Sequence, residues 1–225
     1  MDKKQLSLSL SIILTVVSCV IELPEPTAYF KSANFLPVYA GGEVNLTNQS
    51  ENATEYIWTD NLNMFKTSKD LTYIYYEKGS YPITLTAING EKSDEYTETI
   101  DIYNPSIAIK TYYDGVILSG TYIYIYKDYN DFINSENPIY SGRSQNSSLI
   151  FNDVPLGGYY FDAIYILSDT EALVNWESSN IESYYFEMEN GLRFTDVLSN
   201  LHRVSYKLTN NSMSKKTLVS NVYSK

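Results

Sequence analysis

Two neighbouring segments of this chain alternate apolar and polar residues so regularly that they restrict it to β-structure. Residues 81–88 read YPITLTAI and residues 96–103 read YTETIDIY. Successive side chains of a strand point to opposite faces, so a period of two predicts strands with one buried and one exposed face. Asn89-Gly90 follows the first segment and predicts a hairpin turn, because both residues tolerate positive φ.

Shorter strand-like segments fill the rest of the first half of the chain. Val44 and Leu46 alternate with polar residues, and Leu71, Tyr73 and Tyr75 share one face of a further predicted strand. The segments that carry a family resemblance are 39–46 (YAGGEVNL), 56–58 (YIW), 73–75 (YIY) and 79–87 (GSYPITLTA). Through them the region from about residue 25 to 103 resembles the PKD domain, an immunoglobulin-like sandwich common on bacterial surfaces.

Trp58 is predicted to lie in the core of this first domain, because tryptophan is highly buried on average. The PKD family often follows its tryptophan with a Gly-Asp-Gly turn, whereas residues 59–63 here read TDNLN. A ligand role of that turn is therefore not carried over to this chain.

Asn104-Pro105 interrupts the strand pattern and predicts a boundary between two domains, 26–103 and 106–225. Beyond it, residues 115–126 and 151–163 (FNDVPLGGYYFDA) are similar to the transthyretin-like sandwich of carboxypeptidase regulatory domains. Further strands are predicted over the segments 106–112, 120–127, 149–151, 158–167 and 184–188, with turns at Asp114-Gly115 and over 153–158.

The last part of the chain is less regular. Phe194, Val197, Leu198 and Leu201 have helical spacing and predict a short helix. Residues 210–225 predict a final strand with a loose tail. The sequence as a whole predicts an all-β protein, made of two tandem antiparallel β-sandwich domains after a lipoprotein signal peptide.

The N-terminus has the features of a secretory signal. Two lysines precede an apolar run from Leu6 to Val17, about twelve residues long, whereas a membrane-spanning helix needs about twenty. Small and branched residues then lead to Cys19, the only cysteine of the chain. This ending resembles the lipobox of bacterial lipoproteins, which implies a signal peptide over 1–18, acylation of Cys19 and a lipidated tether over 19–25. The alternative is an unmodified cysteine at the end of a signal.

The charge of the chain limits its partners. The net charge is −11, and the mature chain is one unit more negative because the signal carries two lysines and one aspartate. Such a chain has no field that attracts phosphates, so nucleic acid is not expected as a partner. Anionic headgroups would also repel it, so membrane attachment has to come from lipid on Cys19, where two or more acyl chains anchor stably.

The residues for the common kinds of catalysis are sparse. His202 is the only histidine, no Gly-x-Ser-x-Gly elbow occurs, and His/Cys clusters for zinc are absent from the sequence. Asp128, Asn130 and Asp131 offer oxygen atoms to calcium, but their spacing lacks the glycine and terminal glutamate of a calcium loop. A glycosidase would need two carboxylates in a cleft. We therefore predict no enzyme, no cofactor and no metal site.

The 23 tyrosines suggest another role, since exposed aromatic rings stack on sugars or anchor protein partners. In each adjacent pair within a strand, one ring is expected to point inward and the other outward. The candidate ligand-contacting aromatics are Tyr112, Tyr113, Tyr159, Tyr160 and Trp176.

Together these features predict an extracytoplasmic lipoprotein that acts as a non-catalytic binding, adhesion or spacer module. It is expected at the outer membrane, facing the periplasm or the cell surface, with a protein or glycan as partner. The alternative is a glycan-binding accessory subunit of a polysaccharide-uptake system, which would carry a line of coplanar exposed aromatics.

Overall fold

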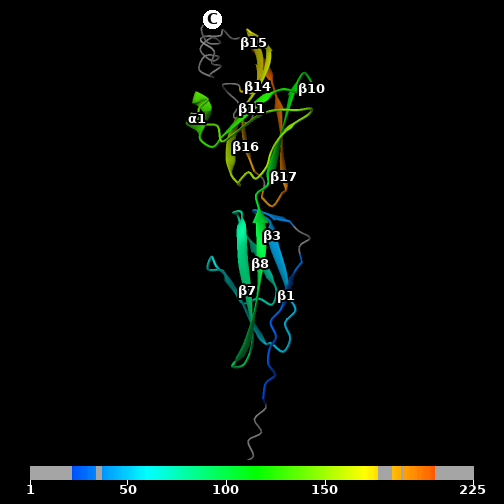
Figure 1. Ribbon diagram of the computed structural model, residues 1–225, viewed down its shortest axis with the longest axis vertical. Coiled ribbons are helices and arrows are strands. Elements are labelled where there is room, and N and C mark those ends of the chain that lie inside the picture. The colour runs from blue at the N-terminus through cyan, green and yellow to red at the C-terminus, as the bar shows by residue number, and fades with distance from the viewer. Residues whose placement is uncertain (1–21, 34–36, 177–183, 189, 206–225) are drawn as a thin grey trace, which may run out of the picture.

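The computed structural model describes residues 22–33, 37–176, 184–188 and 190–205 as two β-sandwiches joined end to end (Figure 1). The predicted all-β fold class is confirmed: apart from one six-residue helix, the regular elements of the described residues are strands. The predicted signal peptide, Cys19 and the segment 210–225 lie outside the described residues. Among those that are described, no helix is long and apolar enough to cross a membrane.

The first sandwich consists of a three-stranded and a five-stranded sheet. The three-stranded sheet has the order β1-β3-β6, and the five-stranded sheet, here the β7 sheet, has the order β2-β8-β7-β4-β5. The strands are β1 (Phe30–Ser32), β2 (Val38–Tyr39), β3 (Glu43–Asn48), β4 (Glu55–Asp60), β5 (Phe65–Lys66), β6 (Leu71–Ile74), β7 (Gly79–Asn89) and β8 (Lys92–Tyr103).

Trp58 lies at the centre of this sandwich, which confirms its predicted place in the core. Its side chain is fully buried, its ring packs against Phe30, and its indole N–H donates to the carbonyl of Ser68 (3.0 Å). Ile83 and Leu85 of β7 are also fully buried, in agreement with the alternation of the sequence. An aromatic ring of this size, buried with its polar atom satisfied, is a major source of stability.

A long hairpin joins β7 to β8, as the sequence predicts, but its turn is centred one residue later. Asn89 pairs with Lys92, so the two central residues are Gly90 and Glu91. Of these only Gly90 has positive φ (+67°). Asn89 instead ends the strand, and its buried amide donates to the carbonyl of Pro24 (2.9 Å).

The second sandwich also has two sheets. In the first, here the β9 sheet, β9 pairs with β10, β13 and β17; in the second, here the β14 sheet, the order is β12-β11-β14-β15-β18 and β16 also pairs with β14. Its elements are β9 (Ser106–Tyr113), β10 (Val116–Ile117), β11 (Tyr122–Tyr126), α1 (Tyr129–Asn134), β12 (Tyr140–Arg143), β13 (Leu149–Phe151), β14 (Gly158–Ser168), β15 (Glu171–Val174), β16 (Tyr185–Glu187), β17 (Phe194–Asn200) and β18 (His202–Ser205).

The predicted helix near residue 194 is wrong, because this segment forms strand β17. Thr195 and Ser199 are buried on its inner side, while Phe194 and Leu198 are exposed on the outer side. Apolar residues on both faces of a strand mimic helical spacing when the outer face is not polar. β17 runs parallel to β9, and β2 runs parallel to β8, so the predicted purely antiparallel pairing is also corrected.

Several other predicted elements are confirmed. Strands occupy 149–151 and all of 158–167, and the predicted turn at Asp114-Gly115 joins β9 to β10. Both turn residues have positive φ (+49° and +75°), which is the geometry of the two-residue hairpin turn that Asp-Gly favours. The transthyretin-like character of the second sandwich stays a prediction.

The two sandwiches contact one another on either side of Asn104-Pro105. The backbone N–H of Gly191 donates to the carbonyl of Ala40 (2.8 Å), and the side chain of Leu156 packs against both hydrophobic cores. Lys78 forms an ion pair with Asp153 (2.8 Å) across the same junction. Independent folding of the two sandwiches stays a prediction.

Candidate binding surfaces

The five predicted ligand-contacting aromatics do not form one platform. Tyr112 and Tyr113 lie at the end of β9, in the β9 sheet, whereas Tyr160 lies in β14, in the other sheet. Trp176 is partly buried against the small cluster of Ala172 and Val174. Because these rings lie on two different sheets, they do not form one line of coplanar exposed aromatics.

Tyr159 has to be removed from this set, because it points inward. Its side chain is only 2% exposed, packs against Phe186 in the core, and donates its hydroxyl hydrogen to the carbonyl of Pro155 (2.7 Å). Burial raises its pKa to about 12. Its neighbour Tyr160 points to the other face of the sheet, which is the alternation expected of a strand.

Tyr160 belongs to an aromatic cluster around α1 that the sequence analysis did not identify. Phe132 of α1 is 3% exposed and stacks on Tyr160 (5.5 Å between ring centroids) and on Tyr184 (4.9 Å). Tyr129 of the same helix also contacts Tyr160 (5.2 Å). Within α1 the three-residue spacing of Tyr129 and Phe132 was the one local signal, because it places both rings on one side of a helix.

This cluster docks the helix on the outer face of the β14 sheet. Each of Tyr160 and Tyr184 is stacked against Phe132 and is only partly accessible. Tyr129 is the exposed member of the cluster, with 44% of its surface accessible. The rings around α1 therefore serve packing more than the recognition of a ligand.

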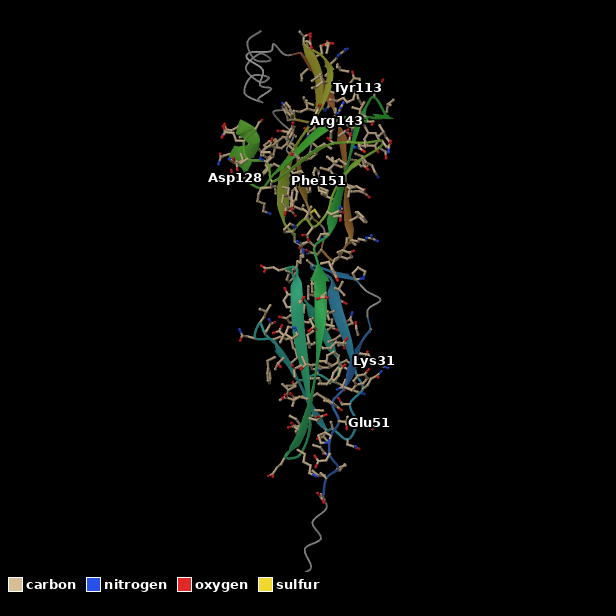
Figure 2. The ribbon with its side chains drawn as sticks, in the orientation of Figure 1. Lys31, Glu51, Tyr113, Asp128, Arg143 and Phe151 are labelled. Carbon is tan, nitrogen blue, oxygen red and sulfur yellow. The ribbon has the colours of Figure 1, made fainter. Side chains whose placement is uncertain are left out.

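Asp128, one of the potential calcium ligands, is occupied in holding the start of the helix (Figure 2). Its carboxylate accepts hydrogen bonds from the backbone N–H groups of Asn130 (2.7 Å) and Asp131 (3.3 Å), as an N-cap residue does. The carboxylate of Asp131 in turn accepts from the amide of Asn137 (3.0 Å). Among the described residues, no three His, Cys, Asp or Glu side chains come together in a way that could hold a metal ion.

His202, the residue that a catalytic triad would need, lies in β18 and is exposed. It pairs with Val174 of β15 across the edge of the β14 sheet. This is a surface position on a strand, where the histidine has no enclosed surroundings in which to activate a nucleophile.

Two buried or partly buried carboxylates accept hydrogen bonds from tyrosines, one in the first sandwich and one on the α1 side of the β14 sheet. In the first, the Tyr75 hydroxyl donates to Asp60 (2.8 Å), whose other oxygen accepts from the backbone N–H groups of Leu62 and Met64. In the second, Tyr126 donates to the buried Asp162 (3.0 Å). Burial and then the neighbouring carboxylate raise the pKa of both tyrosines well above the ordinary value of 10.0. Both hydroxyls are therefore protonated hydrogen-bond donors, not bases.

The outer face of the β9 sheet carries several exposed apolar side chains of the second sandwich. The register places Ile150 beside Ala108, Ile117 beside Tyr112 and Leu198 beside Lys110, all on the side away from the core. We call this surface the β9-sheet face and define it by Tyr112, Ile117, Ile150, Phe194 and Leu198.

The side chains of the β9-sheet face are unusually exposed for apolar residues. Leu198 is 65% exposed, Ile150 49%, Ile117 43% and Phe194 40%. One ion pair crosses the face, from Lys110 to Asp196 (3.5 Å). Ile150 and Leu198 lie on opposite sides of β9 with this ion pair on the same face, and a face with several exposed apolar side chains and few charges is typical of an interaction surface.

Comparisons with known proteins give only remote likenesses. No protein-family model matches the chain, and no curated protein matches it. Among solved structures, the PKD1 domain of Vibrio anguillarum Epp is 21% identical, covers 37% of this chain and all of that domain, and has a TM-score of 0.31. A form of BcpA, the major pilin subunit of Bacillus cereus, is 11% identical over 79% of this chain and 70% of that one, with a TM-score of 0.33. At this similarity they identify neither a site nor an activity here.

Proposed function

We propose that this protein is a lipoprotein, anchored in the outer membrane through Cys19, that acts outside the cytoplasm as a non-catalytic binding or spacer module. The lipobox-like end of the signal supports the anchor. The exposed apolar β9-sheet face is the observation that carries the binding role, because burying such side chains against a partner removes apolar surface from water.

The partner that this face fits best is a protein. Three of its five defining side chains are aliphatic, and sugars are recognised mainly by flat rings surrounded by hydrogen-bonding groups. The aromatic residues that a glycan platform would use lie on two sheets, and Tyr159 is buried. These positions support a protein partner over the alternative, a glycan-binding subunit of a polysaccharide-uptake system.

A photo-cross-linking residue at position 198, in the full-length protein in its own cells, tests this proposal. We expect a covalent adduct with a second protein, and its loss when Ile150→Asp places a charge on the same face, across β9 from the cross-linker. The matched control is the same cross-linker at Phe65, an apolar residue of the first sandwich that is equally exposed (63%).

Three results would contradict the proposal. Equal adduct formation at positions 198 and 65 would mean that the face is not specific. Binding on a glycan array that is lost when Tyr113 and Tyr160 become alanine would favour the glycan alternative. Turnover of a polysaccharide or peptide that copurifies with the protein would overturn the non-catalytic assignment.

A further inference from the structure

We infer that the β7–β8 turn faces the membrane, and that the protein projects its second sandwich away from the bilayer. This inference rests on the anchor at Cys19 that the proposed function assigns. It adds an orientation and a membrane-facing surface, which neither the lipobox nor the fold by itself supplies. The orientation depends on how the residues after Cys19 are held.

Lys92, at the start of β8, holds the segment that follows the anchor. Its ammonium donates to the carbonyl of Leu23 (2.8 Å) and forms ion pairs with Glu25 (2.9 Å) and Glu22 (3.5 Å). The Lys92 side chain is 29% exposed, less than either glutamate. A single exposed ion pair contributes little, but here one cation bonds three groups of the same segment.

Three further contacts fix the same segment on the first sandwich, two of them on the hairpin. The amide of Asn89, which is buried, donates to the carbonyl of Pro24 (2.9 Å). Leu23 lies so close to Gly90 that a Cβ atom at that position would come within 2.7 Å of it. Thr27 then pairs with Glu51 through two backbone hydrogen bonds of 3.0 Å. The predicted tether is thus bound to the sandwich from Leu23 onward.

This attachment limits how far the sandwich can be from the bilayer. The four residue steps from Cys19 to Leu23 span at most about 14 Å when fully extended. If the segment were free as far as Thr27, eight steps would span about 28 Å. The contacts of Lys92 and Asn89 therefore halve the reach of the tether and hold the β7–β8 turn next to the membrane.

The second sandwich lies at the opposite end of the long axis of the molecule. Figure 1 shows the N-terminal segment and the β7–β8 turn at one end, and β10, β14 and β15 toward the other. In Figure 2, Glu51 lies toward the first end and Tyr113 toward the second. The junction contacts of Ala40 with Gly191 and of Lys78 with Asp153 oppose bending between the sandwiches.

The charge of the membrane-facing end determines how it meets the bilayer. Lys92 is the one cation among residues 22–27 and 89–95, and it is already paired with glutamates. Anionic headgroups repel the acidic side chains, so the lipid on Cys19 and not adsorption holds this end at the surface. The exposed acidic residues of this end are Glu22, Glu25, Glu51, Glu91, Asp94 and Glu95.

The two tryptophans allow this orientation to be measured without added labels on the protein, because each sandwich contains one. The mature chain is bound to phosphatidylcholine vesicles that contain a dansyl-lipid acceptor, and energy transfer is measured in Trp176→Phe and Trp58→Phe. We expect Trp58 to transfer more energy than Trp176. Equal transfer, or more from Trp176, would overturn the inference. If Trp58→Phe does not fold, the difference between wild type and Trp176→Phe gives the share of Trp176.

The same assay separates this inference from the proposed function. The native lipoprotein is compared with unlipidated chain whose Cys19 is coupled to a maleimide phospholipid. If the native protein carries no lipid but the coupled form shows the expected transfer, the proposal of a natural lipid anchor is wrong. The inferred orientation of a chain held at Cys19 is then still supported.

Lys92→Ala tests the contacts of the tether. We expect a loss of transfer from Trp58, since the reach of the segment increases, and faster cleavage after Glu22 by a glutamate-specific protease. Lys66→Ala removes the same charge from β5 and is expected to leave both readouts unchanged. If Lys92→Ala matches wild type in both energy transfer and the rate of cleavage, the inference that Lys92 holds the segment on the sandwich is wrong.

Discussion

At the scale of single residues, this protein makes unusual use of tyrosine. Hydroxyls that donate to carboxylates, as in Tyr75 with Asp60 and Tyr126 with Asp162, satisfy polar atoms in the first sandwich and beneath α1 in the second. A buried acceptor left without its donor would cost more than the bond itself contributes. The rings also supply much of the apolar area, for example where Tyr75 stacks on Tyr81 (3.9 Å between centroids).

These tyrosines predict a loss of stability in alkali. The pKa of Tyr75 is raised in the folded state by burial and by Asp60, whereas the unfolded chain titrates at the ordinary value of 10.0. The unfolded state therefore loses its proton first, so this contribution to stability is complete below pH 10 and is lost as the pH rises above it. Urea unfolding at a series of pH values should show a falling free energy of unfolding above pH 10, with a shallower fall in Tyr75→Phe. An identical slope in both proteins would contradict this role.

Trp58→Ala should be among the most damaging single substitutions. The ring is fully buried, so we expect a loss of about 3–5 kcal/mol in the free energy of unfolding, from lost burial and the cavity left behind. Urea denaturation followed by circular dichroism measures it. Tyr76→Ala, which removes a 60% exposed ring, is the control and should change stability by no more than about 0.5 kcal/mol. A comparably small effect of Trp58→Ala would show that the ring is not a core residue.

At the scale of elements, α1 illustrates how local chemistry and tertiary packing combine. The carboxylate of Asp128 caps its first turn, and Ser135 ends it in the left-handed conformation (φ +56°). A six-residue helix is too short to be stable alone. Phe132, stacked between Tyr160 and Tyr184, supplies the tertiary contact that holds it on the β14 sheet.

Asp128→Ala should lower the stability of the second sandwich by about 1 kcal/mol, the usual loss for a helix cap. Asp128→Asn keeps an acceptor for the same two backbone N–H groups and should restore most of this loss. Thermal unfolding of the three proteins provides the comparison. A full loss in the asparagine variant would mean that charge, not capping, is what the position contributes.

The elements also show what the sequence could and could not predict. Regular alternation located β7 and β8, since one face of each is buried and the other is polar. It failed at β17, because Phe194 and Leu198 are exposed apolar residues on the outer face and gave the segment a helical spacing. The cluster around α1 was missed because its rings come from α1, β14 and a turn, which only the tertiary fold brings together. The β9-sheet face likewise depends on the parallel pairing of β17 with β9, for which the sequence has no local signal.

At the scale of the whole molecule, the two sandwiches have separate cores that share Leu156. A chain that ends at Tyr103 should therefore fold on its own, with a β-type circular dichroism spectrum and a cooperative melt. It lacks Leu156 and the hydrogen bond from Gly191 to Ala40, so we expect it to melt at a lower temperature than the first sandwich in the full chain. Absence of a cooperative transition would contradict the predicted boundary at Asn104-Pro105.

In the proposed function, a lipid on Cys19 would place one end of the molecule at the membrane and leave the β9-sheet face of the second sandwich open to a partner. The most direct test is the intact mass of the protein purified from the membranes of its own cells, followed by sequencing of its N-terminal peptide. The account predicts a chain that begins at Cys19 and carries the added mass of acyl groups on that residue, and a Cys19→Ser protein without this mass. A mature chain that begins elsewhere, or one that begins at Cys19 with no added mass, would contradict it.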